Sequence, residues 1–197
     1  MDRSELPALL DFLRGAEQLK NTIRHCYTSE GRRESVAEHT WRLCLMALVF
    51  EKYFADIDFA RLVKICVIHD LGEAIGGDIP APAQVGRPAK AAQERRDLMQ
   101  LLAPLPDVLR DDIAQLWDEY EQATTAEARV AKGLDKLETI LQHIQGQNPE
   151  DFDYRFNLHY GRNHTAGEPL IAALRELLDE ETERRARAAD AAQIRGH

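Results

Sequence analysis

Apolar residues recur every three or four positions along almost the whole chain, whereas strict alternation of apolar and polar residues is scarce. This spacing predicts helices over residues 6–19, 35–54, 58–76, 89–102, 107–122, 124–144, 150–160 and from 165 onward. Two stretches lack it and are predicted to be loops: the polar segment 20–34, and segment 79–88 with its three prolines. Neither repeats nor a domain-scale linker interrupt the pattern. The sequence therefore predicts one all-α domain of about seven or eight helices, spanning residues 1–197 with C-terminal helices over 150–192.

Polar residues at the predicted helix starts support these boundaries. The predicted N-cap residues are Ser35, Asp58, Thr124 and Thr165. Ser35 with Glu38, and Thr124 with Glu127, have the spacing of a capping box. Gly146 is predicted to end the helix that begins after Thr124. From Glu180 the chain is rich in charged residues, which is typical of a solvated helix end.

Three predicted helices carry a titratable side chain on the face that should be buried. His39 shares its stripe with Leu43 and Phe50, and His69 shares its own with Leu62. Asp70 follows His69, and Asp135 lies among leucines in the centre of its helix. Burying such groups is costly unless they are paired or bind a cation. Two imidazoles and two carboxylates suit a divalent transition metal, although unrelated buried hydrogen bonds are the alternative.

Composition narrows the functional classes. The 197 residues carry a net charge of −9, which argues against broad electrostatic binding of nucleic acid polymers or anionic membranes. The longest apolar run, residues 43–50, is too short to span a bilayer, and the N-terminus does not resemble a signal peptide. Three cysteines in an odd, unpatterned set predict free thiols. We therefore expect a cytoplasmic protein that binds neither membranes nor nucleic acid polymers.

Four short motifs resemble those of the HD-domain superfamily of metal-dependent phosphohydrolases. They are SVAEH (35–39), HDLGE (69–73), GDI (77–79) and LDK (134–136). The part of the chain that contains these motifs and resembles the family covers about residues 19–146. Together the motifs look most like the 5′-deoxynucleotidase branch. The resemblance implies a helical phosphomonoesterase that releases phosphate from (deoxy)nucleoside 5′-monophosphates. It also implies one divalent metal ion, with Mn, Co, Fe, Zn and Mg as the candidates.

The resemblance also assigns roles to individual residues. His39, His69, Asp70 and Asp135 match the four metal ligands of the family. Glu73 and Asp78 match acidic residues near the attacking water, and Arg24 matches a basic residue that meets the substrate. Many HD enzymes have Lys where this chain has Glu73. His25 stands where deoxynucleotidases have Trp, so the resemblance does not extend to the sugar-sensing position.

The residues themselves support these roles while leaving alternatives open. On one helix, Glu73 would lie one turn after His69 and could orient or deprotonate a water, or it could be an exposed helix-end residue. Asp78 follows two glycines that permit a close approach, but it could be a simple turn residue. Arg24 could hold a phosphate bidentately or lie on the surface. Lys136 is expected to point outward into solvent.

Other functions within the superfamily remain possible. HD-fold oxygenases and phosphodiesterases with two metals need further histidines after the His-Asp pair, and this chain has none between Asp70 and Gln142. A non-catalytic nucleotide-binding HD domain is the third alternative. The resemblance also predicts a homodimer, and aromatic residues near helix ends support that prediction. These aromatic residues are Trp117, Tyr120, Phe152, Tyr154, Phe156 and Tyr160.

Overall fold

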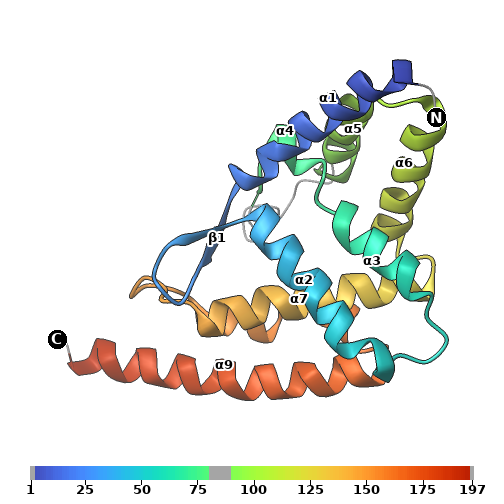
Figure 1. Ribbon diagram of the computed structural model, residues 1–197. Helices are drawn as coiled ribbons and strands as arrows, with labels where there is room; N and C mark the ends of the chain where they lie inside the picture. The colour runs from blue at the N-terminus through green and yellow to red at the C-terminus, as the bar shows by residue number, and fades with distance from the viewer. Residues whose placement is uncertain (1–2, 80–89, 196–197) are drawn as a thin grey trace.

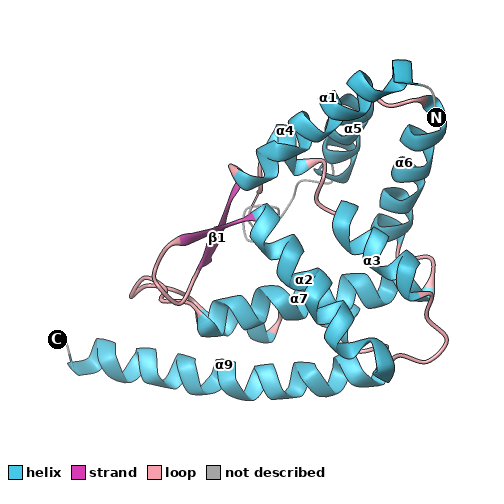
Figure 2. Ribbon diagram, viewed as in Figure 1, coloured by secondary structure: helices cyan, strands magenta, loops and turns pink. Residues whose placement is uncertain are grey.

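The computed structural model describes residues 3–79 and 90–195 and is built almost entirely from helices (Figures 1 and 2). The longer helices are α1 (Leu6–Ala16), α2 (Val36–Phe50), α3 (Phe59–Ile68), α5 (Lys90–Leu102), α6 (Asp107–Gln122), α7 (Ala126–Gln145) and α9 (Pro169–Arg195). Short elements are α4 (Glu73–Gly76), α8 (Arg162–Thr165) and the 3₁₀ turns η1 (Arg3–Glu5), η2 (Glu17–Lys20), η3 (Glu51–Tyr53) and η5 (Tyr154–Leu158). The predicted all-α fold is confirmed.

Helix α7 lies at the centre and packs against α2, α3, α6 and α9. One core cluster surrounds it, and its largest fully buried members include Leu43, Leu62, Leu134 and Leu137. A second cluster lies beneath α1 and α5 and includes Leu98, Leu102 and Trp117. Figure 1 shows α9 running alongside α7 on one side of the molecule, with α1, α5 and α6 on the other. The first cluster therefore fixes the position of α7, and the second fixes the positions of α1 and α5.

The predicted loop over 20–34 is wrong, because this segment contains an antiparallel pair of strands. Strand β1 (Ile23–Tyr27) pairs with β2 (Arg33–Ser35), with Tyr27 opposite Arg33. Burial alternates along β1, but the side chains that point inward are those of Arg24 and Cys26, while Ile23 and His25 are exposed. The strand therefore lacks the apolar alternation by which strands are recognised.

The predicted helix over 58–76 is interrupted. Asp58 caps α3 as predicted, with its side chain accepting a hydrogen bond from the Arg61 amide, but α3 ends at Ile68. A turn follows before α4 begins at Glu73. A Cβ on Gly72 would lie 2.6 Å from the backbone oxygen of Glu94, so glycine allows this turn to pass close to α5. His69 and Asp70 thus lie just beyond a helix end.

Three further boundaries differ from the sequence prediction. Thr125 rather than Thr124 caps α7, accepting from the Ala128 amide. Within 150–160 the structure forms only the turn η5. Thr165 ends α8, and the Glu168 carboxylate accepts from the Ile171 amide in the first turn of α9. The predicted 79–88 loop lies outside the described residues apart from its first position. Among the described residues, no helix is both long and apolar enough to cross a bilayer.

Candidate metal centre and active site

Three elements bring the four predicted metal ligands together. His39 is the fourth residue of α2, whose start is set by the capping box between Ser35 and Glu38. His69 and Asp70 come from the turn after α3, and Asp135 comes from the middle of α7. Because α7 packs against both α2 and α3, these side chains converge. The predicted grouping is therefore present in the fold.

The distances between these side chains suit a shared cation. His39 Nε2 lies 3.2 Å from Asp135 Oδ1 and 3.8 Å from Asp70 Oδ2, and His69 Nε2 lies 3.0 Å from the same Asp70 oxygen. Both Nε2 atoms are buried and have no hydrogen-bond partner. Buried polar atoms normally have a partner, so two such nitrogens facing carboxylates are suited to bind a metal. The donor set fits a divalent cation.

The outer nitrogens of both imidazoles are already engaged. His69 Nδ1 donates to the backbone oxygen of Cys66 at 2.8 Å, and His39 Nδ1 contacts the Glu138 carboxylate. Such contacts orient a histidine and leave Nε2 free to bind a metal. Asp135 is held similarly, because its Oδ2 accepts from the Tyr120 hydroxyl and from Lys136 Nζ, each at 2.7 Å. Lys136 therefore does not point outward as predicted.

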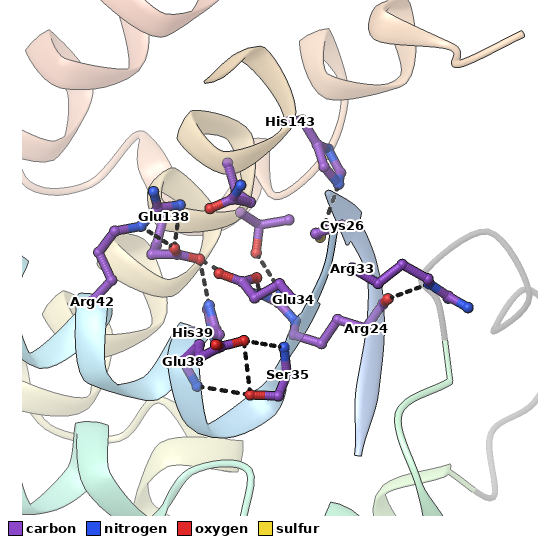
Figure 3. A network of polar contacts seen from close by, with 12 residues as sticks. Arg24, Cys26, Arg33, Glu34, Ser35, Glu38, His39, Arg42, Glu138 and His143 are labelled. Carbon is purple, nitrogen blue, oxygen red and sulfur yellow. Dashed lines mark hydrogen bonds and ion pairs between the residues drawn. The ribbon is translucent and has the colours of Figure 1, made fainter. Parts of the chain in front are cut away.

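Sequence reasoning missed Glu138, which is fully buried behind His39 (Figure 3). Its Oε1 accepts from Arg42 Nε at 2.6 Å, and Arg24 Nη1 lies 3.5 Å from Oε2, the oxygen that contacts His39. Burial opposes the charged carboxylate, but His39, Arg24 and Arg42 outweigh this and hold the pKa of Glu138 at about 2. A signal was present, because Glu138 lies one turn after Leu134 and Asp135 on the same helix.

Glu34, His39 and Glu138 form a second group of potential metal ligands. Its negative charge is already balanced by side chains, since Arg24 pairs with Glu34 at 2.8 Å and Arg42 pairs with Glu138. Figure 3 shows these carboxylates and guanidinium groups in one network, with Cys26 and His143 beside it. We interpret this group as the support of His39 rather than as a second metal site.

Glu73 is buried, so the exposed helix-end alternative is excluded. It reaches the cavity beside the ligands through the turn and α4 rather than along one continuous helix face. Burial, together with the negative charges of Asp70 and Asp78, raises the pKa of Glu73 to about 10. Lys90 Nζ lies 4.0 Å from its carboxylate. Burial and the neighbouring negative charges therefore favour the protonated form of Glu73.

Arg24 and Asp78 line the same cavity. Arg24 is buried, which excludes the surface alternative, and its terminal nitrogens donate to Glu34 at 2.8 Å and to Thr139 at 3.0 Å. A guanidinium has five N–H donors, so further donors remain for a ligand. Asp78 follows Gly77, whose φ of +76° is accessible to glycine. Burial raises the pKa of Asp78, with Arg24 opposing the shift and Asp70 adding to it.

Among the described residues, these side chains open into a cavity of about 1080 Å³. That volume is enough for a ligand of nucleotide size. The sequence did not single out most of the other cavity-lining side chains. They include Lys90, Glu94, Asn163 and His164. The cavity therefore places acids, bases and cations around the candidate metal ligands.

Comparisons with known proteins agree with this arrangement. A family model described as HD domain matches residues 16–175. The 5′-deoxynucleotidase HDDC2 of Bos taurus is 36% identical over 187 residues, covering 93% of this chain and 89% of the bovine protein. Human 5′-deoxynucleotidase HDDC2 is 36% identical over 145 residues, covering 73% of this chain and 70% of the human one.

Solved structures show the same fold. A "predicted metal-dependent phosphohydrolase" from Magnetospirillum magnetotacticum superposes with a TM-score of 0.81 at 28% identity, covering 92% of this chain and 94% of that one. The cyanophage S-2L phosphohydrolase DatZ, bound to dA and one catalytic Zn²⁺, has a TM-score of 0.55 at 18% identity, covering 89% and 96%. The second likeness concerns the fold alone. The family match over most of the chain, together with relatives above 30% identity, shows that this protein belongs to the HD-domain family.

Proposed function

We propose that this protein is a metal-dependent phosphohydrolase that releases phosphate from deoxynucleoside 5′-monophosphates. The relatives named 5′-deoxynucleotidase support the substrate class. The observation that carries the proposal is the pair of buried Nε2 atoms of His39 and His69. Neither makes a hydrogen bond of good geometry, yet they lie 3.2 Å and 3.0 Å from carboxylate oxygens of Asp135 and Asp70 at the edge of the cavity. A single divalent cation there would be held by His39, His69 and Asp70, whose ligand atoms lie within 4.8 Å of one another, with Asp135 beside His39 as the fourth ligand.

The donor set also bears on the choice of metal. Two imidazole nitrogens and two carboxylates suit Mn²⁺, Fe²⁺, Co²⁺ and Zn²⁺ better than Mg²⁺, which prefers oxygen ligands. When bound, such a cation polarises the phosphate and lowers the pKa of water. Within the described residues, the second acidic group around His39 is already neutralised by two arginines. These contacts support one metal ion per chain.

The other side chains of the site have separate roles in the proposed reaction. Arg24 binds the phosphate through the donors that Glu34 and Thr139 leave free. Asp78 orients the attacking water from the cavity wall. Glu73, whose buried position favours the protonated acid, gives its proton to the leaving 5′-oxygen. The products are the deoxynucleoside and inorganic phosphate.

We also propose a homodimer, on grounds different from the aromatic residues named above. Trp117 and Tyr120 are buried, and Phe152, Phe156 and Tyr160 line the cavity, so none of these five offers an outer surface. Helix α2 and η3 instead expose an apolar stripe. We call it the α2 stripe, and it consists of Trp41, Leu45, Leu48, Val49 and Tyr53. Trp41 and Tyr53 are 66% and 70% exposed, and such patches commonly mark protein interfaces.

A phosphate-release panel tests the activity. The metal-free protein is loaded separately with Mn²⁺, Co²⁺, Zn²⁺ or Mg²⁺ and incubated with deoxy- and ribonucleoside 5′-monophosphates and with simple phosphate esters. We expect release from deoxynucleotides with at least one transition metal and no release after chelation. Asp135→Ala is the matched control, because it removes one ligand and should lower metal content by elemental analysis. Absence of phosphate release from every nucleotide with every metal contradicts the proposal.

A further inference from the structure

Three aromatic side chains form a surface of the cavity that the proposed chemistry does not use. They are Phe152, Phe156 and Tyr160, and we call them the aromatic wall. All three line the cavity, and none belongs to either core cluster. The rings of Phe156 and Tyr160 are 5.4 Å apart, and Phe152 packs against the His143 ring at 5.0 Å. The wall is thus an ordered aromatic surface in contact with the cavity.

A single side chain, that of Lys136, connects the aromatic wall to the candidate metal centre. Lys136 Nζ is 2.7 Å from Asp135 Oδ2 and 5.4 Å from the centre of the Tyr160 ring. The neighbouring Gly161 keeps the wall close, because its φ is +66° and a Cβ there would lie 2.6 Å from Lys136 Cγ. A phosphate at the metal centre and a flat group at the wall would therefore lie on either side of the Lys136 ammonium group, within one cavity.

From this geometry we infer that the aromatic wall is the nucleobase subsite, which holds the base of the substrate by stacking. The inference rests on the proposed function, because it concerns the same cavity. A base has two flat faces that stack on aromatic rings whatever its hydrogen-bonding pattern. Stacking of one base strengthens binding by about 10- to 100-fold. The wall therefore favours nucleotides over sugar phosphates that carry no base.

Two substrates and two matched variants test this assignment. The substrates are deoxyadenosine 5′-monophosphate and 2-deoxyribose 5-phosphate, which share the reacting phosphate but differ in the base. Tyr160→Leu keeps an apolar side chain but removes the ring, whereas Tyr160→Phe keeps the ring. Phe156→Leu provides a second ring deletion. Metal content and circular dichroism are measured for each variant, so that only folded, loaded proteins are compared.

We expect wild type to have a kcat/KM at least about 10-fold higher for the nucleotide than for the base-free sugar phosphate. Tyr160→Leu and Phe156→Leu should raise KM for the nucleotide by about 10-fold while leaving the base-free substrate unchanged. Tyr160→Phe loses the hydroxyl that hydrogen-bonds Lys136 but keeps the ring, so it should keep the wild-type ratio of kcat/KM between the two substrates. Equal kcat/KM for the two substrates in wild type, or equal losses on both substrates in the Leu variants, overturns the inference.

Calorimetric titration with deoxyadenosine separates this inference from the activity, since a nucleoside has no phosphate to release. We expect wild type and Tyr160→Phe to bind it, and both Leu variants to bind about 10-fold more weakly. If wild type releases phosphate from neither substrate, the proposed function fails, and the wall is then judged by this titration alone. Undiminished deoxyadenosine binding in both Leu variants, or none in wild type, rejects the wall as a base subsite.

Discussion

At the scale of single residues, the metal centre depends on the side chains behind its ligands as much as on the ligands. His39 is oriented by Glu138, His69 by the Cys66 carbonyl, and Asp135 by Tyr120 and Lys136. Each contact leaves one donor atom pointing toward the shared site. The chain thereby limits the rotamer freedom that the ligands would otherwise lose on binding a cation.

Glu138→Gln tests this support. The amide has the same shape but carries no charge, so it holds the His39 imidazole less firmly and leaves Arg42 without its buried ionic partner. We expect metal affinity to fall by about 10- to 100-fold, measured by titration against a chelator that buffers the metal. Glu127→Gln makes the same change at the start of the same helix and should retain wild-type affinity. Equal affinity in all three proteins contradicts the role of Glu138.

Glu73→Gln tests the proton donor. The substitution removes the acidic proton, but Glu73 is not one of the four proposed ligands, so metal content should stay at the wild-type level. At equal metal occupancy, kcat for deoxynucleotides should fall by about 100-fold or more. A leaving group that needs no proton, such as 4-nitrophenol, should be released with a much smaller loss. Unchanged kcat on deoxynucleotides removes Glu73 from the mechanism.

The grouping of the four proposed ligands could be predicted from sequence because each is a polar residue on an otherwise apolar helix face or directly beside one. Glu138 was missed, and the direction of Lys136 was wrong, for different reasons. Charged residues on helices are usually solvated, so the sequence signal at Glu138 is weak. The packing of α2 against α7 is what buries this side chain. The outward direction predicted for Lys136 failed because the Asp135 carboxylate attracts its ammonium group.

At the scale of elements, the position of each proposed ligand within or beside its helix has a physical cause. His39 lies in the first turn of α2, which the Ser35 capping box holds, and His69 lies where α3 stops. Asp135 lies in the centre of the buried helix α7, where a carboxylate is stable only with partners. A shift of any one of these boundaries by one residue would rotate its ligand by about 100° around the helix axis.

Ser35→Ala tests the cap of α2. It removes the hydroxyl that accepts from the Glu38 amide at 3.3 Å and half of the capping box. We expect the free energy of unfolding in urea to fall by about 1 kcal/mol. Metal affinity should also fall, because the first turn of α2 carries His39. Asp58→Ala removes the cap of α3, far along the helix from His69, and should lower stability by a similar amount with unchanged metal affinity.

The elements that the sequence predicted poorly are short or carry polar residues at positions that are usually apolar. Strand β1 has five residues and points Arg24 and Cys26 inward, so its pattern resembles a polar loop. The break after Ile68 depends on the close approach of Gly72 to Glu94 in α5, 22 residues further along the chain. By contrast, α6 begins and ends where predicted, because Pro106 precedes it and its apolar positions recur through Trp117 and Tyr120.

At the scale of the whole molecule, the α2 stripe predicts self-association. Light scattering should give about twice the 22.4 kDa mass of one chain at micromolar concentration. Leu48→Glu places a charge in the middle of the stripe and should shift the protein to the monomer. Val108→Glu introduces the same charge at an exposed apolar position on α6 and should leave the dimer intact. A wild-type mass of one chain, or a dimer that persists in Leu48→Glu, contradicts this interface.

The convergence of α2, α3 and α7 on one point has a thermodynamic consequence. A cation there acts as a crosslink between residues 39, 70 and 135, which are far apart in the unfolded chain, and it binds only after these elements have docked. Without it, the carboxylates of Asp70 and Asp135 repel one another in a buried place. At a metal concentration 100 times the dissociation constant, the folded state gains about 2.7 kcal/mol. Calorimetry should therefore show a melting temperature about 5–10 °C higher with metal than with chelator, and Asp135→Ala should lose most of that difference, so the lifetime of the folded state should lengthen when metal is supplied.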